Sequence, residues 1–174
     1  MKKWLLALSL AVLAGCGAPG VQDYRDAQPA LDLPQYFLGT TDAWGMFQKR
    51  NGEVVKRFKV VIEGRMEGEQ LVLDERFAYS DGSTDRRVWR LQRQADGQWR
   101  GRAADVIGSA RGELAGNALN WRYSLLLPVD GTTYEVDFDD WMFLIDEQVM
   151  VNRARMSKFG FELGQVTLFF RKRD

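Results

Sequence analysis

Four charged residues stand on the apolar side of segments in which apolar and polar residues alternate. They are Glu75, Asp140, Arg87 and Arg153. In an extended strand, alternate residues share one face, so these side chains are predicted to point inward with their apolar neighbours. A carboxylate inside an apolar interior is costly unless it is paired or hydrogen-bonded. We therefore expect Glu75 and Asp140 to pair with Arg87 or Arg153, or with water, inside the fold or at its mouth.

Aromatic residues close to these positions are predicted to supply the apolar walls of a binding site. They are Trp89, Trp121, Tyr123 and Trp141. Small-molecule sites combine such walls with a few polar groups that fix the orientation of the ligand. The eight residues together form the predicted site for a lipid or another hydrophobic small molecule. The alternative is that the charged residues form a purely structural ion pair at one end of the fold.

The composition excludes several kinds of catalysis. The chain has no histidine, which is the commonest general base and metal ligand, and only one cysteine. Ser-His-Asp and Cys-His catalysis and imidazole zinc sites are therefore excluded. Asp139 and Asp140 are adjacent, so in a strand they face opposite ways, and a carboxylate pair would need Glu75 opposite Asp140. We expect a binding protein with no cofactor and no metal, and we rank a carboxylate-dependent hydrolase or isomerase below it.

The elements that position these residues are predicted to be antiparallel strands. From Gly39 onward the chain alternates apolar and polar residues with a period of two, which is typical of a sheet with one solvent-exposed face. Dipeptides suited to tight turns separate the segments: Asn51-Gly52, Glu67-Gly68, Asp81-Gly82, Asp96-Gly97, Gly116-Asn117 and Asp130-Gly131. This pattern predicts an all-β domain, an up-and-down β-barrel of about 8–10 strands that closes to remove its edges.

Two alternatives to a closed soluble barrel fit the sequence less well. A two-sheet sandwich usually needs long crossover connections, and this chain has few of them. A membrane barrel would need an apolar outer belt, whereas the second face here carries Lys, Arg, Asp and Glu. Residues 103–112 break the alternation and are predicted to form a bulged strand or a corner between two short strands.

The N-terminus has the features of a secretory signal. Lys2 and Lys3 precede a run of apolar residues that is too short to span a bilayer. The run ends in Leu13-Ala14-Gly15-Cys16, which resembles the bacterial lipobox. The resemblance implies cleavage before Cys16 and lipidation of its thiol, which would anchor the protein durably. Because residue 17 is Gly rather than Asp, we expect the periplasmic face of the outer membrane of a Gram-negative bacterium; an ordinary secreted protein is the alternative.

The chain is therefore divided into three parts. Residues 1–15 are a predicted signal peptide, residues 16–34 a lipidated cysteine with a flexible Pro- and Gly-containing tether, and residues 35–174 one barrel domain. Residues 31–37 are expected to dock on that domain as a short extended or helical cap. The formal net charge is zero, so the sequence does not indicate the basic surface stripe that nucleic-acid binding requires. We expect a monomer whose partners are the membrane, through the lipid anchor, and a hydrophobic ligand.

Several short motifs taken together resemble a family of bacterial lipoproteins defined as domain-of-unknown-function family 3833. They are Trp44-Gly45, residues 73–77, Asp81-Gly82, residues 87–89, residues 116–119, residues 139–142 and residues 158–160. The resemblance covers nearly the whole chain after the signal. It implies a single-domain periplasmic lipoprotein and assigns no catalytic residues. The layout is also similar to that of lipocalins and other calycins, which implies a cavity inside the barrel.

These observations leave two main functions open. A small barrel with inward-facing aromatic residues predicts a carrier that holds an apolar molecule. A structural or interaction protein of the cell envelope predicts instead a filled core and a partner surface on the outside.

Overall fold

The computed structural model of the chain describes residues 18–129 and 131–174. The predicted signal peptide and Cys16 lie outside the described residues. Within the described part, no helix is both long and apolar enough to cross a membrane.

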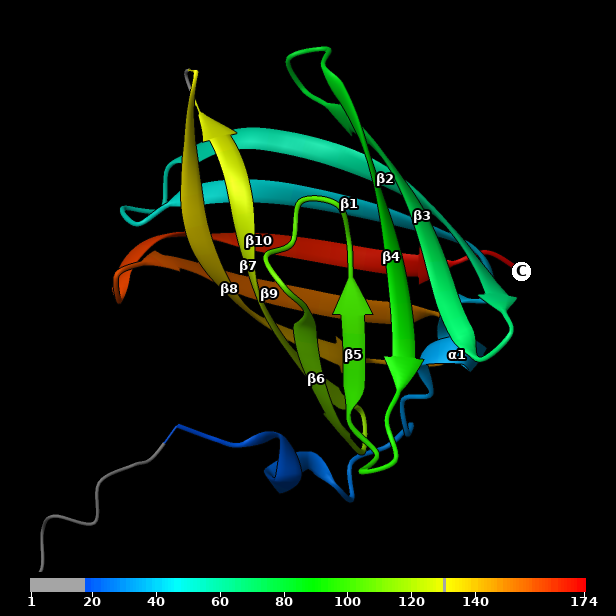
Figure 1. Cartoon of the computed structure of the whole chain (residues 1–174). Helices are drawn as coiled ribbons and strands as arrows, with labels where there is room; N and C mark the ends of the chain where they lie inside the picture. Colours follow the sequence, from blue (N-terminus) through cyan, green and yellow to red (C-terminus); the bar gives the residue numbers. More distant parts are fainter. Residues whose placement is uncertain (1–17, 130) are drawn as a thin grey trace, which may run out of the picture.

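Ten antiparallel strands close into one barrel, which confirms the predicted fold class (Figure 1). Each strand pairs with its neighbours in sequence, and β1 closes the circle by pairing with β10. The sandwich alternative is therefore wrong. The strands are β1 (Gly39–Lys49), β2 (Val54–Glu67), β3 (Gln70–Tyr79), β4 (Thr84–Arg93), β5 (Trp99–Arg102), β6 (Ala110–Ala115), β7 (Ala118–Val129), β8 (Thr132–Leu144), β9 (Val149–Lys158) and β10 (Phe161–Lys172).

Alternation along the strands separates the lumen from the outer surface. On β2, for example, Val60 and Ile62 are buried in the core, whereas Lys59 and Glu63 are exposed. The same period places Leu71 and Leu73 of β3 in the core cluster. The two-residue pattern in the sequence therefore decides which side chains can reach the interior.

The two ends of the barrel differ. The turns β1–β2, β3–β4, β7–β8 and β9–β10 lie around the end that we call the mouth. At the other end, the closed end, the short helix α1 (Leu33–Phe37) packs against β2 and contributes Leu33 and Phe37 to the core. Figure 1 shows α1 tucked under the barrel beside the β2–β3 turn.

Polar contacts fix α1 at the closed end. Its first turn is capped by Asp32, whose carboxylate accepts a hydrogen bond from the Gln35 backbone N–H at 2.8 Å. At the other end of the helix, the Lys172 ammonium donates to the carbonyl oxygens of Tyr36 and Leu38, at 3.0 and 2.8 Å. A cation at a helix C-terminus satisfies carbonyl groups that have no partner within the helix. The helix is thereby tied to the last strand, β10.

The segment before α1 is docked rather than flexible, so the predicted tether over residues 16–34 is wrong from Val21 onward. The 3-10 helix η1 (Val21–Tyr24) contacts β6 and β7, and Val21 is buried with Ala115 and Ala118. Tyr24 packs its ring edge-on against Trp141 and Phe143 on the outer face of β8. The predicted docking of residues 31–37 is confirmed.

Residues 103–109 form a loop between two short strands, as one of the two sequence-based alternatives predicted. Toward the mouth this loop takes the place of β5 and β6 in the barrel wall. Its backbone bonds to β7, through Ile107 N–H to Ser124 C=O at 2.9 Å and Leu126 N–H to Asp105 C=O at 3.0 Å. Among the described residues, no backbone hydrogen bond joins the loop to β4. We call this interruption of the ladder, between β4 and the loop, the seam.

Candidate functional site

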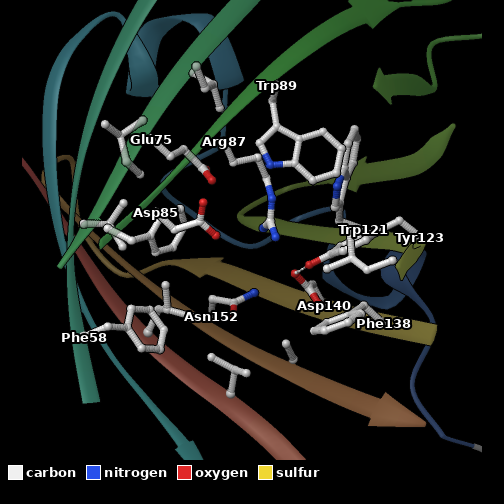
Figure 2. A pocket seen from close by; sticks show the side chains of 18 of the residues that line it. Phe58, Glu75, Asp85, Arg87, Trp89, Trp121, Tyr123, Phe138, Asp140 and Asn152 are labelled. Carbon is white, nitrogen blue, oxygen red and sulfur yellow. Dashed lines mark hydrogen bonds between the residues drawn. The ribbon is translucent and has the colours of Figure 1, made fainter. Parts of the chain in front are cut away.

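The lumen holds a cavity of about 550 Å³. Its walls come from strands all round the barrel, and Leu33 and Phe37 of α1 contribute at the closed end. Most of the side chains that line it are apolar or aromatic, among them Phe58 of β2 and Phe138 of β8 (Figure 2). The volume lies in the range of about 300–1,000 Å³ that is usual for small-molecule sites.

A set of polar side chains interrupts this apolar lining. We call it the polar layer, and its members are Glu75, Arg87, Tyr123, Asp140 and Asn152. Glu75 on β3 and Arg87 on β4 are cross-strand neighbours in the ladder. Tyr123 comes from β7, Asp140 from β8 and Asn152 from β9. Figure 2 shows all five side chains reaching into the lumen from these separate strands.

Arg87 is paired with a residue of the loop. Its Nη2 and Nε donate to one carboxylate oxygen of Asp105, Oδ2, at 2.7 and 3.0 Å. This ion pair crosses the seam between β4 and the loop. Burial lowers the pKa of Arg87, but the charges of Glu75 and Asp105 outweigh that effect and raise it, so the guanidinium stays charged.

Asp140 is almost completely buried. The Tyr123 hydroxyl donates to its Oδ2 at 3.1 Å, and its Oδ1 has no hydrogen-bond partner in the described part of the chain. Burial raises the pKa of Asp140 to about 7, although the bond from Tyr123 and the charge of Arg87 both lower it. This carboxyl group therefore changes charge near neutral pH.

Glu75 lies in a comparable environment. The exposed part of its side chain faces the lumen rather than the outer surface (Figure 2). Burial raises its pKa to about 7, and the charge of Arg87 offsets only part of that rise. Two carboxyl groups that titrate near pH 7 thus share one cavity, which is the behaviour expected of a functional site.

Asn152 is a further member of the site that is not among the residues predicted from the sequence. Only 1% of its surface is exposed, and neither its amide nitrogen nor its amide oxygen has a partner among the residues described. Buried amides are normally satisfied, so this one can accept and donate hydrogen bonds to something in the lumen. The signal was present in the sequence, because Asn152 stands between Met150 and Ala154 on the inward side of β9.

Aromatic rings surround the polar layer. Trp89 packs edge-on against Trp121 and Tyr123, with centroids 5.7 and 5.4 Å apart, and Tyr123 stacks on Phe138 at 5.0 Å. The Trp121 indole lies flat against two glycines of the wall, Gly101 and Gly112, where any added Cβ would overlap the ring. The rings are therefore held in place by close packing, as a preformed site requires.

Six of the eight predicted site residues line the cavity: Glu75, Arg87, Trp89, Trp121, Tyr123 and Asp140. The prediction that Arg153 points inward is wrong. The inward residues of β9 are Met150, Asn152, Ala154 and Met156, so Arg153 is exposed on the outer face, where its Nε donates to Gln165. The prediction that Trp141 lines the site is also wrong, because its side chain lies on the outer face of β8 under Tyr24.

The predicted pairing of the inward charges is only partly realised. Arg87 forms its ion pair with Asp105, a residue that the sequence analysis did not single out, and Glu75 has no ion-pair partner within 4 Å in the described part of the chain. Over residues 18–129 and 131–174, no group of three or more His, Cys, Asp and Glu side chains is placed to hold a metal ion.

Comparison with known proteins gives a family match and a fold. A family model described as "Protein of unknown function (DUF3833)" matches residues 10–172. No curated protein matches the sequence. The structure is similar to the S-type phycobiliprotein lyase CPES from Guillardia theta, with a TM-score of 0.60, 4% identity, and coverage of 90% of this chain and 99% of that chain.

A second solved structure has a comparable likeness. It is a protein of unknown function from the DUF3598 family of Nostoc punctiforme PCC 73102, with a TM-score of 0.58 and 13% identity. The alignment covers 91% of this chain and 53% of that one. At these identities the likeness concerns the fold alone, and it places the chain among lipocalin-like barrels.

Proposed function

The chain belongs to the DUF3833 family of proteins of unknown function, and we propose that it binds a small hydrophobic molecule in the lumen of its barrel. The observation that carries the proposal is the cavity of about 550 Å³, with apolar and aromatic walls around one polar layer. A structural core would be filled and would satisfy its buried polar groups. Here space remains beside Asp140 and Asn152, whose side chains retain unpartnered polar atoms among the described residues.

The proposal predicts that filling the cavity abolishes binding. Ala154 lies on β9 opposite Asp140, is 2% exposed and lines the cavity, so Ala154→Trp places an indole where a ligand would lie. We expect the Kd of the neutral apolar dye N-phenyl-1-naphthylamine to rise at least about tenfold, equivalent to about 1.4 kcal/mol of binding free energy. Dye fluorescence, titrated with the mature chain carrying Cys16→Ser, measures this effect.

The matched control is Arg153→Trp, which adds the same side chain one position away, on the outer face. It should leave the Kd of the dye unchanged. If the unmodified barrel bound no dye, or if both tryptophan variants bound it equally well, the lumen would not be the binding site. An interaction protein of the cell envelope would then be the better explanation.

We propose further that the protein is lipid-anchored through Cys16 at the periplasmic face of the outer membrane, as a monomer. The lipobox-like residues 13–16 support this proposal. Four residues lie between Cys16 and Val21, where the docked segment begins, so the five steps from one Cα to the next span at most about 18 Å. Since η1 packs beside the β6–β7 turn at the closed end, an anchor at Cys16 would hold that end near the bilayer and turn the mouth away from it.

The anchor is tested by metabolic labelling with a radioactive or clickable fatty acid. We expect the label in the unmodified protein and none in a Cys16→Ala variant. Equal labelling of the two proteins, or no labelling of either, would contradict lipidation at Cys16.

A further inference from the structure

The cations and the carboxylates that line the lumen differ in whether they have ion-pair partners. Of the described residues, two cations line it, and both already have a carboxylate partner: Arg87 is bonded to Asp105 at 2.7 Å, and the Lys56 ammonium lies 2.9 Å from Asp81. A second anion entering the lumen would have to compete with these partners. The charge of each cation is therefore already balanced by a carboxylate, although only Nε and Nη2 of Arg87 donate to Asp105.

The carboxylates of the lining are in the opposite situation. Glu75, Asp85 and Asp140 all line the cavity, and within the described residues none of the three forms an ion pair. Figure 2 shows Asp85 and Glu75 on one side of the lumen and Asp140 on the other. At neutral pH and above, the lumen thus carries an excess of negative charge.

Two buried groups show where a ligand would be held. Asp140 is 6% exposed and keeps Oδ1 unpartnered, and Asn152 is 1% exposed and keeps both amide atoms unpartnered, counting all the residues described. Both side chains are aimed into the lumen (Figure 2). The two unpartnered oxygens are acceptors and the Asn152 amide nitrogen is a donor, so among these atoms the acceptors outnumber the donor two to one.

The aromatic rings beside these acceptors suit a cation as well. Trp121 and Trp89 lie in the layer of the lumen next to Asp140 and Glu75, and Phe138 lies on the mouth side of Asp140. The faces of aromatic rings attract ammonium groups, most strongly when the groups are removed from water. An apolar chain would extend from this layer along the Phe and Val side chains toward the mouth.

We propose that the lumen selects hydrophobic molecules that carry a protonated amine, with the ammonium group bound by Asp140 and the Asn152 amide oxygen and with Glu75 contributing negative charge from across the lumen. This inference rests on the proposed function and specifies its ligand class. A primary ammonium group supplies three donors and one positive charge, which match the unpartnered acceptors and the unpaired carboxylates. A fatty acid would instead bring a fourth carboxylate to a site whose arginine is already paired.

Proton exchange should accompany the binding. Arg87, Asp85, Asp105 and Tyr123 lie in or beside the lumen with Glu75 and Asp140, whereas Asp74 and Asp139 act on them only through charge, from the outer faces of β3 and β8. Burial raises the pKa of Glu75 and of Asp140 to about 7, so a bound ammonium favours their ionised forms and releases protons. Amine affinity should therefore increase as the pH rises from 6 to 8, while the affinity of a neutral ligand should not follow this trend.

The test uses three probes that share a ten-carbon alkyl chain: decylamine, decanol and decanoate. Each is titrated as a competitor of N-phenyl-1-naphthylamine for the mature protein carrying Cys16→Ser. We expect decylamine to displace the dye at a concentration at least about tenfold lower than either of the others at pH 8. In the double variant Glu75→Gln/Asp140→Asn this preference should disappear while the dye still binds. The control Glu113→Gln/Glu135→Gln removes two exposed outer carboxylates and should retain the preference.

The other outcomes separate the two proposals. If the dye binds and decanol or decanoate displaces it as well as decylamine does, the amine inference is wrong and the proposed function stands. A preference for decylamine that survives in Glu75→Gln/Asp140→Asn also overturns the inference. If neither the dye nor any of the three probes binds, the proposed function fails and the inference fails with it.

Discussion

Replacing Glu75 and Asp140 by their amides is expected to stabilise the protein strongly at pH 8. A buried carboxyl group with a raised pKa binds its proton more tightly in the native state than in the unfolded state. Its contribution to stability is complete below its unfolded pKa, near 4.5 for Glu75 and 3.8 for Asp140, and is lost as the pH rises through about 7. The variant Glu75→Gln/Asp140→Asn has no such proton to lose.

The size of the effect follows from the two pKa shifts. Each unit of pKa difference corresponds to about 1.36 kcal/mol. Between pH 5 and pH 8, the stability of the double variant relative to the unmodified protein should therefore increase by an amount on the order of 4 kcal/mol. Urea unfolding followed by tryptophan fluorescence at the two pH values measures this change.

The outer-face variant Glu113→Gln/Glu135→Gln is the control, since both side chains are exposed. Its stability relative to the unmodified protein should change little between the two pH values. If the lumen variant behaved like this control, Glu75 and Asp140 would be hydrated, and the polar layer would lie in open solvent rather than in a closed lumen. The expected gain in stability on replacing two ionisable groups by neutral amides also fits a site kept for binding at a cost to folding.

The second large effect is expected for Gly64→Ala, which should open the closed end. An added Cβ at Gly64 would overlap the backbone carbonyl of Phe37, the last residue of α1. Because a backbone atom cannot rotate away as a side chain can, α1 must move off β2. Leu33 and Phe37 would then lose their places in the core.

We expect Gly64→Ala to lower the free energy of unfolding by about 3 kcal/mol, since overpacking costs about 1–3 kcal/mol and exposing a buried Leu or Phe costs about 1.5–3 kcal/mol. Urea unfolding measures the loss, and limited proteolysis should show earlier cleavage before β1. Gly20→Ala is the control, because an added Cβ there meets nothing within 4 Å. Equal stability of the two variants would show that α1 is only loosely attached.

The strand pattern was predictable because the face of the sheet on which a residue lies depends only on its position within its own strand. The alternation in β3 and β8 placed Glu75 and Asp140 correctly in the lumen, since each has clearly apolar neighbours two positions away. The same rule failed in β9, where both faces carry apolar residues. Val149 and Val151 suggested the wrong inward face, and Arg153 was placed with them.

The other errors come from contacts made between distant parts of the chain. Trp141 follows the inward Asp140 and so had to point outward, where a large aromatic residue is unusual; it is covered by Tyr24 of a segment predicted to be flexible. Asp105 lies in a loop without periodicity, and only the folded path of that loop brings it to Arg87. Neither contact leaves a signal within a short window of sequence.

The seam makes one side of the barrel deformable. Around the rest of the polar layer, a wider barrel would require backbone hydrogen bonds to stretch or break. Between β4 and the loop over residues 103–109, the Arg87–Asp105 ion pair is the one polar contact that spans the wall among the residues that the structure describes. An oversized ligand can therefore be accommodated by parting two side chains and letting the loop swing outward on its bonds to β7. On that side the circumference of the lumen can therefore change at the cost of one ion pair rather than of backbone hydrogen bonds.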